Sequence, residues 1–181
     1  MTKQAILVID LQNEYLPTGK LPLVGIENAA ANAAKIIANA RENDIQVIHV
    51  QHVFAHGEMP VFEPNSNGIE IQKQVAPLDH EVVIVKNYVN SFLQTNLKQV
   101  LQENAIEELV IIGAMSHMCI DAAVRAASDF GYKVKVVHDA CATLDLDFNG
   151  LKVPAAYAHA TLMAAFQFAY AAVISTDDYL S

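Results

Sequence analysis

The chain has few cysteines, few basic residues and no long apolar run. Only two of its 181 residues are cysteines, Cys119 and Cys141. Two cysteines without a secretion signal indicate free thiols in a reducing compartment and argue against a disulfide framework. The first apolar run ends at Asp10 after five residues, which is too short for a signal-peptide core or a membrane span. We therefore expect a cytoplasmic protein with no membrane segment.

Basic residues are outnumbered by acidic ones. The 11 Lys and Arg residues face 20 Asp and Glu residues, the net charge is −9, and no basic cluster is longer than a pair. This balance argues against nucleic acid or an anionic membrane as a partner. The length favours one domain over residues 1–181. With 53% apolar residues, part of the surface is expected to be covered in a homodimer or homotetramer.

Short apolar runs alternate with helical patterns along the chain. Most of the runs are β-branched and apolar on both alternating faces, as in strands covered on both sides; they lie at 5–9, 45–50, 82–85, 109–112, 134–137 and 172–175. The run at 134–137 alternates more and is expected to be less buried. Helices are predicted at about 26–40, 94–103, 117–130 and 154–170. The order predicts an α/β protein with three α/β/α layers and a six-stranded, mainly parallel, Rossmann-like sheet.

Two segments depart from this simple alternation. The last predicted helix is apolar nearly all round, which is typical of a helix covered on both sides, here between subunits. The stretch 51–81 contains several Gly and Pro residues and is too long for a plain connection. Loops of that size in compact α/β domains are often functional.

Three reactive side chains follow predicted strands. Asp10 closes the first strand, Lys86 closes the third, and Cys119 follows the fourth in the turn GAMSHMC, which leads into a helix. Ligands of open α/β sheets bind beyond the carboxyl ends of the strands, so these residues are expected to converge there. The helix N-terminus and the Lys86 ammonium favour a thiolate, and Asp10 can take and return a proton.

Each of these residues also has a structural interpretation. Asp10 can cap a turn, Lys86 can be a solvated strand end, and Cys119 can be a small core side chain. Their shared position at one edge favours the functional interpretation for the three together.

The surrounding segments resemble the isochorismatase-like cysteine hydrolases, a superfamily that includes nicotinamidases and N-carbamoylsarcosine amidases. The matching segments occur in the family's order, and only the stretch between His56 and Glu81 is unmatched. They are ILVIDLQNEYL at 6–16, VIHVQH at 47–52, VIVKNYVNSFLQTNL at 83–97, LVIIGAMSHMCIDAAVRAASDFGYKVKVVHDACAT at 109–143 and VPAAYAHA at 153–160.

The resemblance implies a Cys–Asp–Lys triad that cleaves a small-molecule amide or related C–N bond. Asp10 removes the thiol proton, Lys86 orients and polarises, and Cys119 forms an acyl-enzyme that water hydrolyses. It also implies a cis peptide bond at Ala114–Met115, which aims the backbone N–H groups of Met115 and Cys119 at the oxyanion. Cys141 is interpreted as buried packing.

The remaining site residues are expected around the triad. The proposed substrate-binding residues flank triad positions or line the pocket, although Phe92 is equally explained as core; they are Gln12, Asn13, His52, Tyr88, Phe92 and His117. Metal-binding members of the superfamily carry an Asp-x-His pair after the second strand, and that Asp is absent at Gln51. We therefore expect no metal and no cofactor, with His49, His52 and His56 as the only alternative ligand set.

Three other functions stay open. An isochorismatase cleaves a vinyl ether by protonating carbon and needs no thiol, so Cys119 speaks against that activity. A catalytically idle binding protein of the same fold is possible, although an intact triad argues against it. A redox role is disfavoured because the chain has no C-x-x-C pair.

Overall fold

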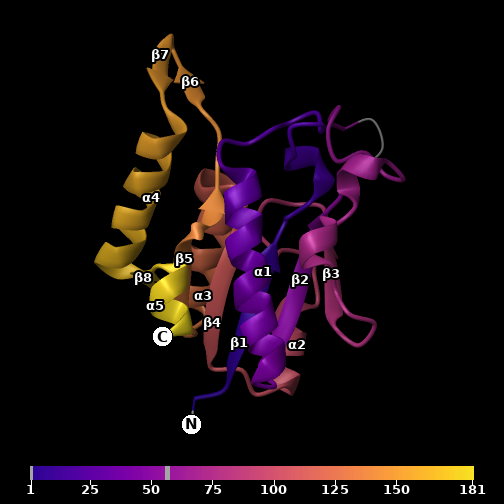
Figure 1. Cartoon of the computed structure of the whole chain (residues 1–181), viewed down its shortest axis with the longest axis vertical. Coiled ribbons are helices and arrows are strands. Elements are labelled where there is room, and N and C mark those ends of the chain that lie inside the picture. Colours follow the sequence, from indigo (N-terminus) through magenta and orange to yellow (C-terminus); the bar gives the residue numbers. More distant parts are fainter. Residues whose placement is uncertain (1, 56–57) are drawn as a thin grey trace.

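Six parallel strands form one sheet in this computed structural model, which describes residues 2–55 and 58–181 (Figure 1). The strand order is β3-β2-β1-β4-β5-β8. The strands are β1 (Gln4–Ile9), β2 (Gln46–His52), β3 (Val82–Lys86), β4 (Glu108–Ala114), β5 (Lys133–Ala142) and β8 (Ala172–Ile174). The predicted six-stranded α/β architecture is confirmed, except that the sheet is parallel throughout instead of mainly parallel.

Helices cover both faces of this sheet, as the three-layer prediction required. On one face, Ile6 and Val8 pack against α1 (Ile26–Glu42), beside which lies α5 (Thr176–Leu180). On the other, Leu7 and Ile9 pack among residues of α2 (Leu97–Glu103), α3 (Asp121–Asp129) and α4 (Ala155–Ala169). Alternate residues of β1 therefore enter different cores, as the two-residue period of a strand requires. None of the helices in the described residues is long and apolar enough to cross a membrane.

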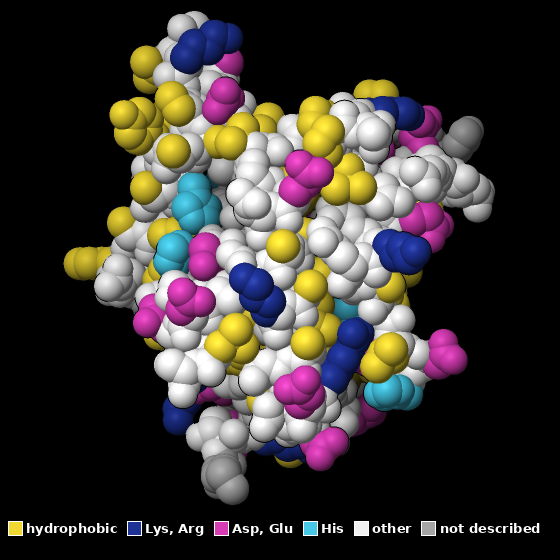
Figure 2. Space-filling view, in the orientation of Figure 1, with side chains coloured by type: hydrophobic (Ala, Val, Ile, Leu, Met, Phe, Trp, Pro, Cys, Tyr) yellow, Lys and Arg dark blue, Asp and Glu magenta, His cyan; other side chains and the backbone are white. Residues whose placement is uncertain are grey.

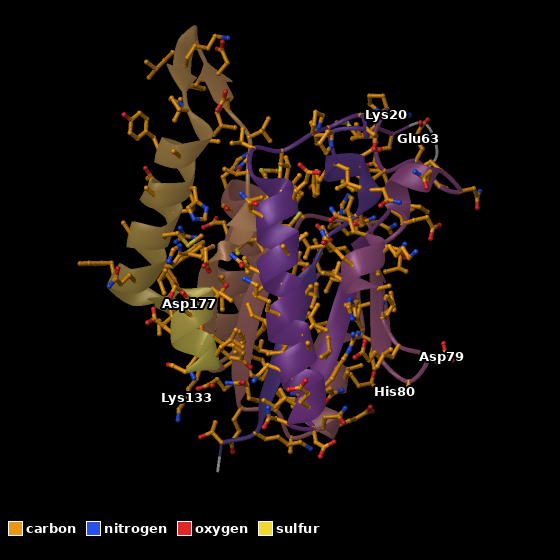
Figure 3. All side chains as sticks on the ribbon, in the orientation of Figure 1. Lys20, Glu63, Asp79, His80, Lys133 and Asp177 are labelled. Atoms are coloured by element: carbon orange, nitrogen blue, oxygen red, sulfur yellow. The ribbon has the colours of Figure 1, made fainter. Side chains whose placement is uncertain are left out.

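The long stretch 51–81 folds against the end of β1. It contains two short 3-10 turns, η2 (Asn67–Ile69) and η3 (Lys73–Val75), and a third, η1 (Asn13–Tyr15), follows β1. Gln12 and Ile71 form an isolated antiparallel bridge. The ammonium of Lys20 pairs with the carboxylate of Glu63 at the outer rim of the loop (Figure 3). The stretch thus lies beside the carboxyl edge of the sheet.

The first turns of two helices differ from the sequence prediction. The helix expected from 94 begins at Leu97, because Gln94 has a left-handed backbone with a φ of 54°. The helix expected from 117 is divided into a π-helical turn, η4 (Ser116–Ile120), and the α-helix that begins at Asp121. A π-helical turn widens the backbone locally and occurs often at functional sites.

Two elements were not predicted, although the sequence contains a signal for each. Strands β6 (Leu146–Phe148) and β7 (Leu151–Val153) form a hairpin through Asn149 and Gly150, both of which have positive φ angles. Asn-Gly is the dipeptide preferred in such turns. Helix α5 begins with a capping box between Ser175 and Asp178, so Ser175 belongs to the helix cap and not to the preceding strand.

Burial differs from the expected pattern at one edge of the sheet. The strand expected at 82–85 was interpreted as covered on both faces, which is wrong: Val83 and Val85 are 40% and 53% exposed. Strand β3 is an edge strand that α1 does not cover. Strand β5 is less buried than β1, as expected, with Lys133 exposed and Lys135 partly exposed.

Helix α4 carries exposed aromatic side chains. Tyr157 is 69% exposed and Phe168 is 92% exposed, and the neighbouring hairpin exposes Phe148 and Leu151. Figure 2 shows these hydrophobic groups gathered along α4 and the hairpin. The predicted apolar helix is confirmed, and in the single chain its outer face is open.

Candidate active site

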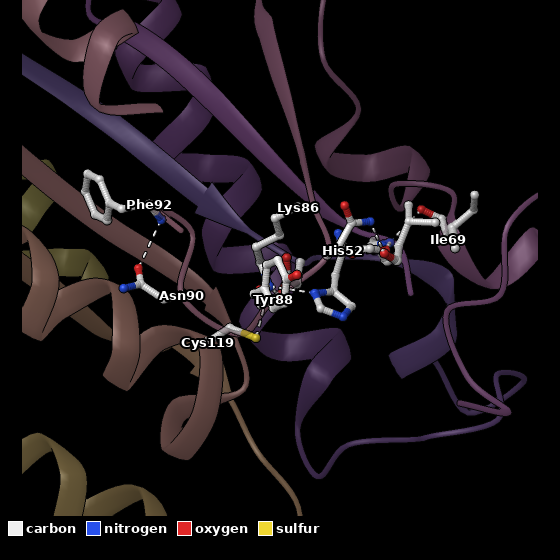
Figure 4. Close-up of polar contacts among 11 residues, drawn as sticks. His52, Ile69, Lys86, Tyr88, Asn90, Phe92 and Cys119 are labelled. Atoms are coloured by element: carbon white, nitrogen blue, oxygen red, sulfur yellow. Dashed lines mark hydrogen bonds and ion pairs between the residues drawn. The ribbon is translucent and has the colours of Figure 1, made fainter. Parts of the chain in front are cut away.

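Asp10, Lys86 and Cys119 meet at the carboxyl edge of the sheet, as the sequence predicted. Lys86 Nζ lies 2.9 Å from Asp10 Oδ2 and 3.2 Å from Cys119 Sγ. The Asp10 and Lys86 side chains are fully buried, and Cys119 is 5% exposed. Figure 4 shows the Lys86 side chain reaching from the end of β3 toward the Cys119 sulfur in η4. The arrangement places an acid, a cation and a thiol in direct contact.

Close approach of β4 to β1 allows this convergence. Gly113 has a φ of 127°, and a Cβ atom at this position would lie 1.9 Å from the carbonyl oxygen of Ile9. Asp10, the next residue of that strand end, has a φ of 53°, and its N–H donates to Val50 O at 3.0 Å. The peptide bond Ala114–Met115 is cis, which confirms the prediction made for it.

Burial and charge determine the resting protonation of the triad. Burial lowers the pKa of Lys86, but the charge of Asp10 and the hydrogen bonds of the ammonium with Asp10 and Cys119 outweigh it and raise that pKa. Burial raises the pKa of Cys119, as does the Asp10 carboxylate, and Lys86 only partly opposes them. The raised pKa favours a thiol over a thiolate at rest, which agrees with the expected role of Asp10 as acceptor of the thiol proton. An ammonium, a carboxylate and a neutral thiol leave the buried site with no net charge, which is the least costly state in a low dielectric.

His52 is the fourth side chain at this site. Its Nδ1 lies 2.8 Å from Lys86 Nζ (Figure 4), and the residue is 3% exposed. Burial, followed by the charge of Lys86, lowers the pKa of His52 to about 4. The imidazole is therefore neutral near pH 7. The sequence predicted His52 as a pocket residue but gave no sign of its contact with the triad lysine.

Gln12 and Asn13 hold the loop that follows β1. Gln12 is fully buried; its Nε2 donates to His52 O at 2.8 Å and to Ile69 O at 2.7 Å, and its Oε1 accepts from His52 N at 2.8 Å. Asn13 Nδ2 donates to Asn67 O at 3.2 Å. Both predicted site residues thus join the end of β1 to the 51–81 stretch. Direct contact with a substrate stays a prediction for them.

Tyr88 and Phe92 have different environments. The carbonyl of Tyr88 accepts from Lys86 Nζ at 3.2 Å, and the residue is 43% exposed. Phe92 donates from its backbone N–H to Asn90 Oδ1 at 3.0 Å, and its ring packs edge-on against Phe130 at 5.2 Å. Figure 4 shows Phe92 on the far side of Asn90 from Cys119. The core interpretation therefore accounts for the position of Phe92.

The turn that carries Cys119 is tied to the end of β5. His117 Nδ1 lies 2.6 Å from Thr143 Oγ1. The buried Ser116 hydroxyl donates to Ala142 O at 3.3 Å and lies 2.8 Å from His159 Nδ1 on α4. Cys141, in the same strand end, is a buried free thiol, in agreement with its expected packing role.

Four aromatic rings form a wall beside the triad, and their contacts with one another were not predicted from the sequence. It consists of Tyr15, His52, Phe54 and Phe62, whose rings meet edge-on with centroid distances of 5.0 Å for Tyr15–Phe62, 4.3 Å for His52–Phe54 and 5.4 Å for His52–Phe62. Burial raises the pKa of Tyr15, and so does the nearby charge of Asp10. Tyr15 lies inside a segment matched to the superfamily, but its ring direction depends on the loop residue Phe62.

The histidines expected as an alternative metal site do not converge. His49 and His52 are three positions apart on β2, so they point to opposite faces. His49 Nε2 lies 3.2 Å from Glu81 Oε2, and His56 is outside the described residues. Within residues 2–55 and 58–181 no group of three His, Cys, Asp or Glu residues is arranged to hold a metal ion.

Comparison with known proteins gives one consistent result. A model described as the isochorismatase domain matches residues 4–178. An uncharacterised isochorismatase family protein of Bacillus subtilis is 48% identical over 97% of this chain and 98% of its own length. Maleamate amidohydrolase of Pseudomonas putida is 30% identical over 76% of this chain and 71% of its own. A crystal structure from Oleispira antarctica, described as a putative isochorismatase hydrolase, is 50% identical with a TM-score of 0.95, covering 99% of this chain and 97% of that one.

Proposed function

We propose, on the premise that this chain belongs to the isochorismatase family of hydrolases, that it cleaves a small-molecule amide or related C–N bond with Cys119 as nucleophile. The observation that carries the proposal is the contact of Cys119 Sγ with Lys86 Nζ, which also pairs with Asp10. A relative named maleamate amidohydrolase supports the choice of an amide substrate.

In the first half-reaction Asp10 accepts the thiol proton while the sulfur attacks the carbonyl carbon. A C–S bond forms, and an electron pair moves to the carbonyl oxygen, toward the proposed N–H donors of Met115 and Cys119. The proton moves within the triad, so the site stays neutral up to the attack. The C–N bond then breaks, and the proton on Asp10 passes to the leaving nitrogen.

In the second half-reaction water cleaves the thioester. Asp10 takes a proton from water as its oxygen attacks the acyl carbon, and the C–S bond breaks. The proton on Asp10 then returns to the sulfur, which restores the thiol. The products are a carboxylic acid and ammonia or an amine. Lys86 stays charged throughout and stabilises both the carboxylate and the transient thiolate.

The competing activities fit this site less well. Vinyl ether hydrolysis of the isochorismatase type gives the sulfur beside Lys86 no role. A catalytically idle binding protein needs no buried acid, ammonium and thiol in contact, because burying charged groups costs stability. We further propose that the enzyme acts in the cytoplasm on a small molecule, without a bound cofactor, and that Asn13, Tyr88 and His117 contact that molecule.

A panel of small primary amides, monitored for ammonia release, tests the proposal. We expect release by the wild-type protein and a loss of at least about 10³-fold in Cys119→Ala, since the nucleophile carries the covalent step. Cys141→Ala is the matched control and keeps the activity. Mass spectrometry of a quenched reaction should show an acyl group on the Cys119 peptide. Undiminished ammonia release by folded Cys119→Ala would disprove the assignment.

A further inference from the structure

His52 has a buried hydrogen-bond donor that no part of the mechanism uses. The side chain is 3% exposed, and its Nε2 atom has no hydrogen-bond partner among the described residues. Its other ring nitrogen, Nδ1, lies 2.8 Å from Lys86 Nζ. A buried polar atom without a partner is costly and calls for an explanation, and at the edge of an active site a ligand can supply the partner.

The contact with Lys86 determines which nitrogen carries the proton. An ammonium group has donors only, so Nδ1 must accept, and the single proton of the neutral ring is then on Nε2. The backbone of His52 is held at both its N–H and its C=O by the side-chain amide of Gln12, at 2.8 Å each. Position and tautomer are thus both determined before any ligand arrives.

The surroundings of Nε2 are apolar. Phe54 and Phe62 meet the His52 ring edge-on, and Tyr15 extends the same wall toward Cys119 and Asp10. Figure 4 places Nε2 at the end of the imidazole that faces away from Lys86. A buried donor among aromatic rings discriminates strongly, because a ligand without an acceptor leaves it unsatisfied.

We propose that His52 is a specificity-determining residue, whose Nε2–H donates to an uncharged acceptor atom of the substrate other than the scissile carbonyl. The inference rests on the proposed amide hydrolysis and names its substrate class. The class is uncharged amides with an ether, hydroxyl, carbonyl or ring-nitrogen acceptor near the scissile group. A ligand N–H at this position is rejected, because Lys86 prevents the ring from presenting Nε2 as an acceptor.

A competition experiment tests this without any turnover. Methoxyacetamide and butyramide have the same chain length and differ by one ether oxygen. Each is titrated as a protectant of Cys119 against alkylation by iodoacetamide, followed by mass spectrometry. We expect the wild-type protein to bind methoxyacetamide at least about 5-fold more tightly, which is a modest value for one hydrogen bond. The preference should vanish in His52→Leu and persist in His52→Gln, which keeps a donor.

His80→Leu is the matched control, because His80 is an exposed histidine in the loop before β3 (Figure 3), whereas Lys86 lies at the opposite end of that strand. It should keep the wild-type preference. Nitrogen-15 spectra of histidine-labelled protein should show Nε2 protonated and Nδ1 unprotonated for His52 at pH 7, the signal being assigned by its loss in His52→Gln. Equal protection by the two amides, no protection by either, a preference that persists in His52→Leu, or a proton on Nδ1 would each overturn the inference. Preference without ammonia release from any amide of the panel would reject the proposed hydrolysis and leave only the role of His52 as a donor to a bound ligand.

Discussion

Asp10 and Lys86 form an ion pair of 2.9 Å in which both side chains are fully buried. The Cys119 thiol contacts this pair, and the two charges act on it in opposite directions, since the carboxylate raises the pKa of the thiol and the ammonium lowers it. Variants of the two residues should therefore affect thiol chemistry oppositely, even though both are proposed to abolish hydrolysis.

Asp10→Asn should speed alkylation of Cys119 by iodoacetamide at pH 7. The substitution removes a charge that raises the thiol pKa and leaves Lys86 in place, so a larger fraction of the sulfur is ionised. Lys86→Met should slow the same reaction. Both variants should lose ammonia release by about 10³-fold or more. Parallel changes in alkylation, or turnover at wild-type rates in either variant, would remove that residue from the triad.

Gly113→Ala should strongly destabilise the fold. A Cβ atom at 113 would lie 1.9 Å from Ile9 O, and the φ of 127° is itself unfavourable for alanine. We expect the free energy of unfolding in urea to fall by at least about 3 kcal/mol. Gly150→Ala is the control, because its φ is also positive but nothing lies within 4 Å of the added atom. Its loss should be limited to about 1 kcal/mol. Equal losses would disprove the close-contact argument.

The free energy of unfolding should fall at acid pH because Glu81 becomes protonated. Burial alone raises the pKa of Glu81, but hydrogen bonds from Arg41 and from the Leu78 N–H lower it to about 2. A lowered folded pKa adds stability above the unfolded value of 4.5, and that stability is lost as the pH falls from 4.5 toward 2. Burial also lowers the pKa of His49, so its protonation below pH 6.5 destabilises the fold in the same direction.

The substitution Arg41→Gln tests the contribution of the Glu81 carboxylate to stability. Arg41 donates to both Glu81 oxygens at 2.8 Å and is partly exposed, so we expect a loss of about 1–2 kcal/mol at pH 7. The loss should shrink as the pH falls to 2. Arg125→Gln, which removes an exposed pair with Asp121, is the control and should change stability by about 0.5 kcal/mol or less. A loss independent of pH would contradict the linkage.

The protein should self-associate through α4 and the β6–β7 hairpin. Phe168 and Tyr157 on the helix and Phe148 on the hairpin are all more than two-thirds exposed, an apolar surface that a second copy can cover. Light scattering at micromolar concentration should give a dimer or tetramer. Tyr157→Glu with Phe168→Glu should shift the mass toward the monomer. Asp79→Lys, on the opposite side of the molecule from α4 (Figure 3), should not. A wild-type monomer would contradict the proposal.

Turnover should survive chelation. The Asp of the metal-binding relatives is absent at Gln51, and His49 and His52 point to opposite faces of β2. Ammonia release should be the same before and after dialysis against EDTA. Loss of activity in EDTA, restored by zinc or iron, would show that a metal site exists.

The parallel sheet and the convergence of Asp10, Lys86 and Cys119 at its carboxyl edge could both be predicted from the sequence, for one physical reason. Parallel strands present their carboxyl ends at a common edge, so three reactive residues after three apolar runs had to lie near each other. Asn149-Gly150 and Ser175 with Asp178 carried equally clear local signals that were not used.

Other features of the site depend on tertiary structure and could not be predicted from the sequence. His52 meets Lys86 because strands β2 and β3 pair them in register, and periodicity does not determine that register. The Tyr15–Phe62 contact joins two loops without periodicity. The sequence showed the helix N-terminus and Lys86, which favour a thiolate at Cys119, but it did not show the burial or the closeness of the Asp10 charge, which raise the pKa of the thiol.

Burial of Cys119 as a neutral thiol also affects how readily its sulfur is oxidised. Peroxide and other oxidants react with the thiolate, and their access depends on exposure. A nucleophile that is 5% exposed and protonated at rest presents little of the form that is oxidised. In the proposed mechanism the sulfur becomes nucleophilic only when Asp10 takes its proton during attack. We therefore expect the idle enzyme to resist sulfenic acid formation, because burial and the Asp10 carboxylate both favour the protonated thiol.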